Sequence, residues 1–362
     1  MTLRSRIIVL ALLLLIAIGI HVYSLNAVRV EWQYSHGFFP SFSSMQRNMT
    51  SWIPISFGDI LYGLAAFWIV IKARKYLKRL GKIRNMKVSK AAFYNTMLKI
   101  GILTISIYII FNVFWAINYN RKGIAWQLGL DMKSYTATDL RGINCLLIDK
   151  VNEAKTSLIT KAERYPSNKI LFKKTYDAYK QASGEYAFMR YEPASLKTSL
   201  WGWLGNYSGF TGYYNPFTGE AQVNTTVPKF LQPFIACHEV AHQVGYAKEM
   251  EANFVGYLAA TASDDTLFHY SVYLDLFTYA NRNLFFIDSS SAKLYKKELL
   301  PSVVKDLKEW RAFNLGHQSP LEPVVRWMYG IYLQGNQQPM GILSYDEVTA
   351  FIISFYKKFG YI

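Results

Sequence analysis

One stretch of the sequence, Cys237 to Leu258, constrains most tightly how this chain can fold. It contains His238, Glu239 and His242 in the pattern His-Glu-x-x-His. Two histidines four positions apart lie on one face of an α-helix, so both imidazoles can reach the same metal ion. Neutral imidazoles at neutral pH suit zinc (Zn²⁺). The stretch therefore predicts a zinc-binding helix, with Glu239 placed to take a proton from a water that the metal activates.

A third metal ligand is expected shortly after the second histidine. Gly245 can end the first helix, and 247–260 again has helical character. On such a helix Glu249 shares a face with Asn253. That pairing supplies a carboxylate for the metal and an amide that could hold a ligand histidine by its other ring nitrogen. We therefore predict Glu249 as the third ligand and Asn253 as the residue that holds a ligand histidine, with Glu251 as the alternative ligand.

This stretch resembles the glutamate-zincin metallopeptidases, in which a Glu-x-x-x-Asp helix follows His-Glu-x-x-His. The segment Glu-Met-Glu-Ala-Asn is similar to that element, with Asn253 in the place of the aspartate. The resemblance implies that His238, His242 and Glu249 bind zinc and that Glu239 is the catalytic base.

More of the chain resembles an uncharacterised bacterial family of membrane-anchored, predicted zinc-dependent proteases. The recurring pattern of that family looks like GYYNPFTGEAQVN, at Gly212–Asn224 here, followed by CHEVAHQVG and EMEAN. The resemblance covers most of the chain and implies proteolytic activity close to a membrane.

Three apolar runs in the first third of the chain predict transmembrane helices at about 7–25, 53–71 and 100–117. The first run could instead be a cleaved signal peptide, because its apolar core is short. Asp59 falls near one end of the second run, where we expect it at the membrane interface. Trp115 and Tyr119 are expected as interface aromatics at the end of the third.

The charge distribution predicts how these helices are oriented. The segment 72–99 has ten basic residues and no acidic ones, which is typical of a cytoplasmic loop. Three crossings with a cytoplasmic N-terminus place the remainder of the chain on the outer side of the cell (inner) membrane. We therefore expect a membrane region at 1–119 and an extracytoplasmic domain at 120–362.

The formal net charge of +16 also raises the possibility of a nucleic-acid partner. From residue 123 onward, however, 24 basic residues face 22 acidic ones. The excess of positive charge therefore belongs to the basic loop and the N-terminus, so we expect no nucleic-acid partner.

The rest of the domain reads as mostly helical, with a small β-hairpin over 212–224. Tyr213 and Tyr214 lie on that hairpin and are candidate contacts for a substrate or for the oxyanion of a tetrahedral intermediate. Helices are expected over these ranges: 139–162, 171–188, 232–244, 267–286, 292–313 and 324–333.

These patterns together predict a multi-pass membrane protein with a mainly helical, zincin-like domain. The function we expect is that of a zinc metallopeptidase that hydrolyses peptide bonds outside the cytoplasm. Its expected partners are the lipid bilayer and a peptide or protein substrate. The alternative hypothesis is a catalytically inactive membrane scaffold or binding protein that zinc stabilises.

Overall fold

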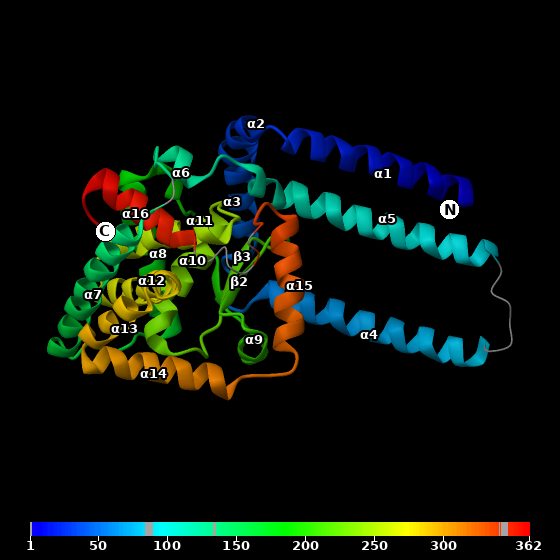
Figure 1. The fold of residues 1–362 in the computed structure, drawn as a ribbon. Helices are drawn as coiled ribbons and strands as arrows, with labels where there is room; N and C mark the ends of the chain where they lie inside the picture. Colours follow the sequence, from blue (N-terminus) through cyan, green and yellow to red (C-terminus); the bar gives the residue numbers. More distant parts are fainter. Residues whose placement is uncertain (1, 84–89, 133–134, 340, 342–346) are drawn as a thin grey trace.

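The computed structural model describes residues 2–83, 90–132, 135–339, 341 and 347–362 (Figure 1). The α-helices are α1 (Leu3–Ser24), α2 (Ala27–Arg29), α3 (Phe39–Thr50), α4 (Phe57–Ile83), α5 (Lys90–Phe114), α6 (Ile124–Gln127), α7 (Ala137–Thr160), α8 (Asn168–Glu185), α9 (Gly202–Ser208), α10 (Gln232–Gln243), α11 (Glu249–Ala262), α12 (Thr266–Ile287), α13 (Ser289–Glu298), α14 (Pro301–Gly316), α15 (Glu322–Gly335) and α16 (Val348–Phe359). Shorter or wider helical turns are η1 (Val30–Phe38), η2 (Ala116–Asn120), η3 (Ala187–Met189) and η4 (Lys229–Leu231), and the strands are β1 (Leu196–Thr198), β2 (Gly212–Asn215) and β3 (Glu220–Val223).

The fold is mostly helical with one small sheet, as the sequence predicted. The strand order is β1-β3-β2. Strands β2 and β3 pair antiparallel, with Tyr213 opposite Gln222, which confirms the predicted hairpin. Strand β1 pairs parallel with β3 and was not predicted, because a strand of three residues is too short to show alternation.

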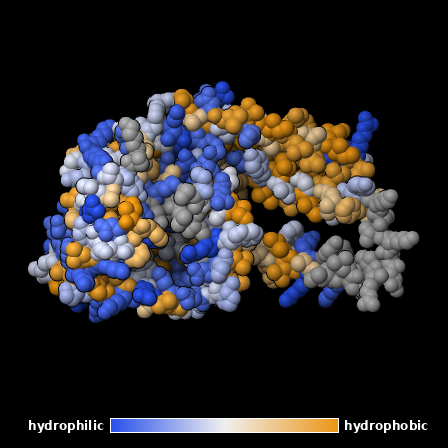
Figure 2. Space-filling model, in the orientation of Figure 1, coloured by the Kyte–Doolittle hydropathy of each residue, from blue (hydrophilic) through white to orange (hydrophobic). Residues whose placement is uncertain are grey.

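Three long helices, α1, α4 and α5, extend from the same side of the helical domain (Figure 1). Helix α1 lies along α5 and runs in the same direction, because Arg6 donates a hydrogen bond to Asn95 and Leu10 lies beside Gly101. Apolar residues cover most of this pair (Figure 2). Such surfaces are stable when lipid rather than water surrounds them.

Two helices in the described part of the chain are long and apolar enough to cross a membrane, at Leu3–Ser24 and Ala91–Phe114. They suggest that the protein associates with a membrane. By length and composition the described part of the chain has two such helices and not the three predicted, because α4 begins only at Phe57 and carries charges in both halves. Its uncharged stretch, 60–71, is shorter than the roughly 20 apolar residues of a typical transmembrane helix.

Most of the segment predicted as a basic loop is also helical. Helix α4 continues to Ile83 and α5 begins at Lys90, so only 84–89 separates them, and those residues lie outside the described part of the chain. Basic residues have high helix propensity, which explains why their composition did not mark a loop.

The domain is built around α10 and α11, which pack against α8, α12 and α16, and α7 packs against α12 (Figure 1). The central pair has buried residues on nearly every face, so it forms the middle of the core. Most predicted helices appear within a few residues of their expected bounds. The range 292–313 instead forms two helices, because Pro301 begins a new one.

A second apolar cluster joins the domain ends of α1 and α5 to the domain. It includes Val30, Phe39, Trp115, Tyr119 and Tyr214, all of them buried. Trp115 and Tyr119 therefore pack inside the protein, and the prediction that they lie at a membrane interface is wrong. Their rings contact His242 and Tyr332 of the domain, because the chain turns into η2 directly after α5.

Candidate metal centre

Helix α10 carries both histidines of the His-Glu-x-x-His pattern. It begins at Gln232, and Pro233 occupies its first turn, where a missing N–H removes no helical hydrogen bond. The ring centroids of His238 and His242 are 4.8 Å apart on one face of the helix. The predicted ligand helix is therefore confirmed, with Gln243 as its last residue.

A sharp turn after α10 brings α11 back against the histidines. Gly245 has φ +100°, a conformation that L side chains rarely adopt. Further along α11, a Cβ atom on Gly256 would lie 3.1 Å from the backbone nitrogen of His238. These two glycines allow the close contact that places Glu249, the first residue of α11, beside both imidazoles.

The three predicted ligands form one compact cluster. Oε2 of Glu249 lies 3.2 Å from Nε2 of His238 and 3.5 Å from Nε2 of His242. One ligand atom from each residue lies within 4.8 Å of the other two, so the cluster could hold a metal ion. All three residues line the same cavity, which leaves a side of the cluster open to a small molecule.

The outer nitrogens of both imidazoles are held in place. Nδ1 of His238 lies 2.7 Å from Oδ1 of Asn253, the residue predicted for this position. Nδ1 of His242 lies 2.7 Å from the backbone oxygen of Tyr246. Both acceptors favour a proton on Nδ1, which leaves the Nε2 lone pairs directed at the centre of the cluster.

Two residues from the C-terminal part of the chain hold Glu249, and sequence reasoning missed both. The hydroxyl of Tyr329 on α15 donates to Oε1 of Glu249 at 2.6 Å, and the backbone N–H of Glu249 donates to Gln338 at 2.9 Å. Burial alone would raise the pKa of Glu249, but the two neighbouring imidazoles hold it well below its usual range. The carboxylate is therefore charged and available as a ligand.

Glu239 lies in the same cavity and makes few polar contacts. Its side chain is buried, and its Oε2 accepts no hydrogen bond from any described residue. Burial raises the pKa of Glu239 to about 7. A Cβ atom on Gly212 of β2 would lie 2.5 Å from Oε1 of Glu239, so a larger residue there would make this side chain shift. Such a carboxyl group is suited to proton transfer near neutral pH.

Glu251, the alternative ligand, points away from the cluster. A Cβ atom on Gly123 would collide with its carboxylate, and Arg121 and Lys248 are its nearest cations. Residues two apart on a helix face different directions, so Glu249 and Glu251 cannot both reach the histidines.

The two candidate tyrosines of β2 line the cavity but face different neighbours. The hydroxyl of Tyr213 donates to Asp59 on α4. The ring of Tyr214 packs 5.4 Å from the ring of Trp115, measured between centroids. These contacts direct the Tyr213 hydroxyl toward α4, away from the metal cluster.

The cavity has a volume of about 330 Å³, within the usual range for small-ligand sites. Its walls come from the metal cluster, from β2 and from α15, together with residues at the domain ends of α4 and α5. A larger hollow of about 1390 Å³ lies beside α3 and η3, and it contains none of the predicted site residues.

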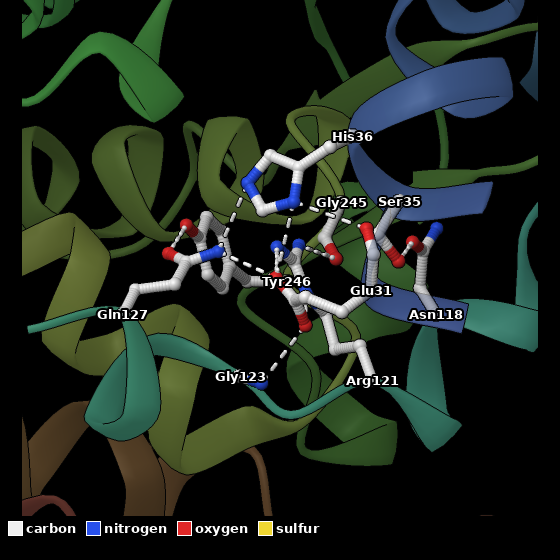
Figure 3. A network of polar contacts seen from close by, with 9 residues as sticks. All are labelled: Glu31, Ser35, His36, Asn118, Arg121, Gly123, Gln127, Gly245 and Tyr246. Carbon is white, nitrogen blue, oxygen red and sulfur yellow. Dashed lines mark hydrogen bonds and ion pairs between the residues drawn. The ribbon is translucent and has the colours of Figure 1, made fainter. Parts of the chain in front are cut away.

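A buried polar network supports the turn that follows His242 (Figure 3). Arg121 donates to Glu31 at 2.6 Å and to the backbone oxygen of Gly245 at 3.0 Å, and its guanidinium lies over the ring of Tyr246. Burial alone would raise the pKa of Glu31, but Arg121 holds it below its ordinary value. The segment between α1 and α4 thus fixes the backbone that orients the second histidine.

Polar residues of the 212–224 pattern anchor the first turn of α4. The carboxylate of Glu220 accepts the backbone N–H groups of Phe57 at 3.1 Å and Gly58 at 2.6 Å, where the helix dipole favours negative charge. Asp59 in turn accepts the backbone N–H of Leu200 at 2.6 Å. The carboxylate of Asp59 therefore has hydrogen-bond donors from the domain and links α4 to it.

Residues 34–353 match the model of a protein family described as a protein of unknown function (DUF3810). The match covers most of the chain, so the chain belongs to this family. No curated protein and no solved structure matches it.

Proposed function

We propose that this protein is a membrane-anchored zinc metallopeptidase that hydrolyses peptide bonds outside the cytoplasm. One observation carries the proposal: His238, His242 and Glu249 converge in a cavity that also contains the buried carboxyl group of Glu239. Two imidazoles and one carboxylate are a known ligand set of catalytic zinc. The proposal also agrees with the resemblance to glutamate-zincins, in which these positions have the same roles.

Zinc fits these residues better than calcium or magnesium does. Two imidazole nitrogens and one carboxylate oxygen suit zinc, whereas calcium and magnesium prefer oxygen ligands only. The hydrogen bonds that hold Nδ1 of each histidine are the outer contacts that zinc ligands usually have. When bound, zinc would polarise the scissile carbonyl group and lower the pKa of the attacking water.

The chain itself supplies the proton transfers. Glu239 would take one proton from the attacking water as its oxygen adds to the carbonyl carbon. It would then deliver that proton to the amine nitrogen as the C–N bond breaks, which leaves an amine and a carboxylic acid, and the acid releases its remaining proton to solvent. Gly212 leaves room for this carboxylate in its present position, because a Cβ atom at that residue would overlap the Glu239 side chain.

We further propose that α1, α4 and α5 all cross the inner membrane, with the N-terminus in the cytoplasm. The parallel direction of α1 and α5, together with the return of the chain along α4, supports an odd number of crossings. Basic side chains in the second half of α4, beginning with Lys72, have long apolar stems that can extend to a headgroup region. This orientation would place the metal centre on the outer side.

The direct test is peptide cleavage by the purified full-length protein in lipid nanodiscs with added zinc, measured on a proteome-derived peptide library by mass spectrometry. Glu239→Gln should lower the rate by roughly 100-fold or more, since it removes the general base. The same variant should keep its zinc. If the zinc-loaded wild type cleaves nothing and Glu239→Gln remains fully functional in cells, the inactive zinc-stabilised scaffold is the better explanation.

A further inference from the structure

The metal cavity lies where the membrane helices meet the domain. Tyr62 of α4 and Phe111 of α5 line it, and so does Trp115 directly after α5. Opposite them are the metal ligands on α10 and α11. A substrate that reaches the ligands therefore passes residues at the ends of two helices that we assign to the membrane.

The α1–α5 pair and α4, which lie on the two sides of the route to the cavity, do not pack closely against each other in the described part of the chain. Helix α1 packs along α5, and no comparable packing joins α4 to either helix among the residues that the structure describes. Figure 2 shows an open space between the α1–α5 pair and α4. In a bilayer this space would be open to lipid and to membrane-inserted chains.

An apolar pocket adjoins the metal cavity on the α4 side. It has a volume of about 360 Å³ and shares Tyr62, Phe210 and Tyr213 with the metal cavity. Trp201 and Leu204 add further apolar walls. The two spaces therefore lie side by side and share walls, and the second has room for a large apolar side chain of a molecule bound near the first.

The neighbourhood of this pocket resembles a membrane interface. The residues leading into α9 and along it include exposed apolar side chains, at Leu200, Trp201, Trp203 and Leu204. The ring of Trp201 lies against Gly63 of α4. Tryptophans and leucines exposed beside a membrane helix are typical of a segment that touches the headgroup layer.

The charge of the walls restricts the occupant further. The walls of both spaces contain no lysine or arginine among the described residues. Apart from the proposed zinc ion, a phosphate headgroup or the terminal carboxylate of a peptide would meet no cation there, and it would face the carboxyl groups of Glu239 and Glu249. The walls therefore favour a neutral, apolar stretch within a longer chain.

We propose that the substrate is an apolar segment of a membrane-inserted polypeptide, which enters between α4 and α5 and places one large side chain in the pocket formed by Trp201, Leu204 and Phe210. This inference rests on the proposed peptidase function. It adds the substrate class and the direction of entry, and it implies cleavage at an internal peptide bond.

The test uses two probes with the same short, uncharged peptide sequence and one photoreactive benzoylphenylalanine. One probe carries an N-terminal palmitoyl group, which inserts it into the bilayer, and the other carries an acetyl group. Glu239→Gln protein in nanodiscs is irradiated with each probe, and labelled residues are mapped by mass spectrometry. The wild type is assayed in parallel for cleavage.

We expect the palmitoylated probe to label residues around α9 and Tyr62, with a yield several-fold above that of the acetylated probe. Leu204→Lys should lower this labelling roughly tenfold, because it places a charge in an apolar pocket. Leu204→Trp, which stays apolar and fills the pocket, should lower it similarly. Leu294→Lys makes the same change at an exposed site on α13 and should have no effect.

Equal labelling by both probes, labelling away from the pocket, or labelling that both Leu204 variants leave unchanged would overturn the proposal. Labelling does not need turnover, so the two proposals fail separately. Pocket labelling without cleavage by the wild type would support the entry route and refute the peptidase. Cleavage of the acetylated probe at the same rate as the palmitoylated one would support the peptidase and refute entry from the bilayer.

Discussion

Replacing Glu31 with glutamine should destabilise the protein by about 3–5 kcal/mol. The side chains of Glu31 and Arg121 are 0% and 2% exposed, and they form an ion pair at 2.6 Å. The same carboxylate accepts hydrogen bonds from the backbone of Gly123 and from Gln127. Glutamine has a similar size but no charge, so it would leave Arg121 buried without its counter-charge.

The same replacement should weaken metal binding at a distance. Arg121 holds the carbonyl of Gly245, and the next residue supplies the carbonyl that orients His242. If the turn shifts, the Nε2 atom of His242 loses its fixed direction. Loss of such an outer contact typically lowers metal affinity 10- to 100-fold, and we expect about that change for Glu31→Gln.

The assay is denaturant unfolding of the zinc-loaded protein in detergent micelles, followed by circular dichroism, together with zinc competition against a chelator. Glu153→Gln is the matched control, because that side chain is 77% exposed and should change stability by no more than about 0.5 kcal/mol. The double replacement Glu31→Gln/Arg121→Met should recover part of the loss, since it removes the uncompensated charge. A change for Glu31→Gln as small as that of the control would refute this reasoning.

Three further predictions concern the site and the domain. Asn253→Ala should lower zinc affinity about 10- to 100-fold in chelator competition. Asn253→Asp should retain the affinity, because aspartate still accepts the imidazole N–H. A zinc affinity of Asn253→Ala equal to that of the wild type would contradict the assigned contact. Gly212→Ala should displace the Glu239 carboxylate and lower peptidase kcat roughly 100-fold with zinc content unchanged, and full activity would show that the strand can move aside. A hydrogen bond from Lys357 holds the pKa of Asp139 at about 2. This carboxylate therefore stabilises the domain above about pH 4, and that contribution is lost as the pH falls toward 2. Asp139→Asn should remove on the order of 0.5 kcal/mol of that pH dependence in acid unfolding curves.

Local periodicity predicted the centre of the site well. The i, i+4 spacing of the histidines and the pairing of Glu249 with Asn253 depend only on helix geometry, and the structure has both helices in place. The choice of Glu249 over Glu251 follows from the same geometry, because only one of them can face the histidines. The hairpin was predictable for a similar reason, since Pro216 and Gly219 mark its turn.

Contacts between distant segments were not predictable from pattern alone. Tyr329 reaches Glu249 from a helix 80 positions later in the chain, and nothing near it marks a metal site. Trp115 follows an apolar helix, so its composition indicated a membrane interface, yet its ring lies against His242. Glu31 and Arg121 are ordinary charges in the sequence, and only the folded chain shows that they meet.

The bounds of the helix predicted at 53–71 were misjudged for a different reason. A hydropathy pattern detects an apolar run, but it does not show where the helix begins or how far charged residues extend it. In the structure, Glu220 caps α4 at Phe57, and the helix continues through basic residues to Ile83. The cap comes from a strand more than 150 positions away, so no local signal marked it.

The central claim is tested most directly by the zinc content of the purified wild-type protein beside Glu249→Ala and Glu251→Ala, measured by inductively coupled plasma mass spectrometry after reconstitution. The geometry predicts close to one zinc ion per chain in the wild type and in Glu251→Ala, and a large loss in Glu249→Ala. Retention in Glu249→Ala with loss in Glu251→Ala would contradict the assigned ligand. No zinc in the wild type would contradict the metal centre, and the proposed peptidase with it.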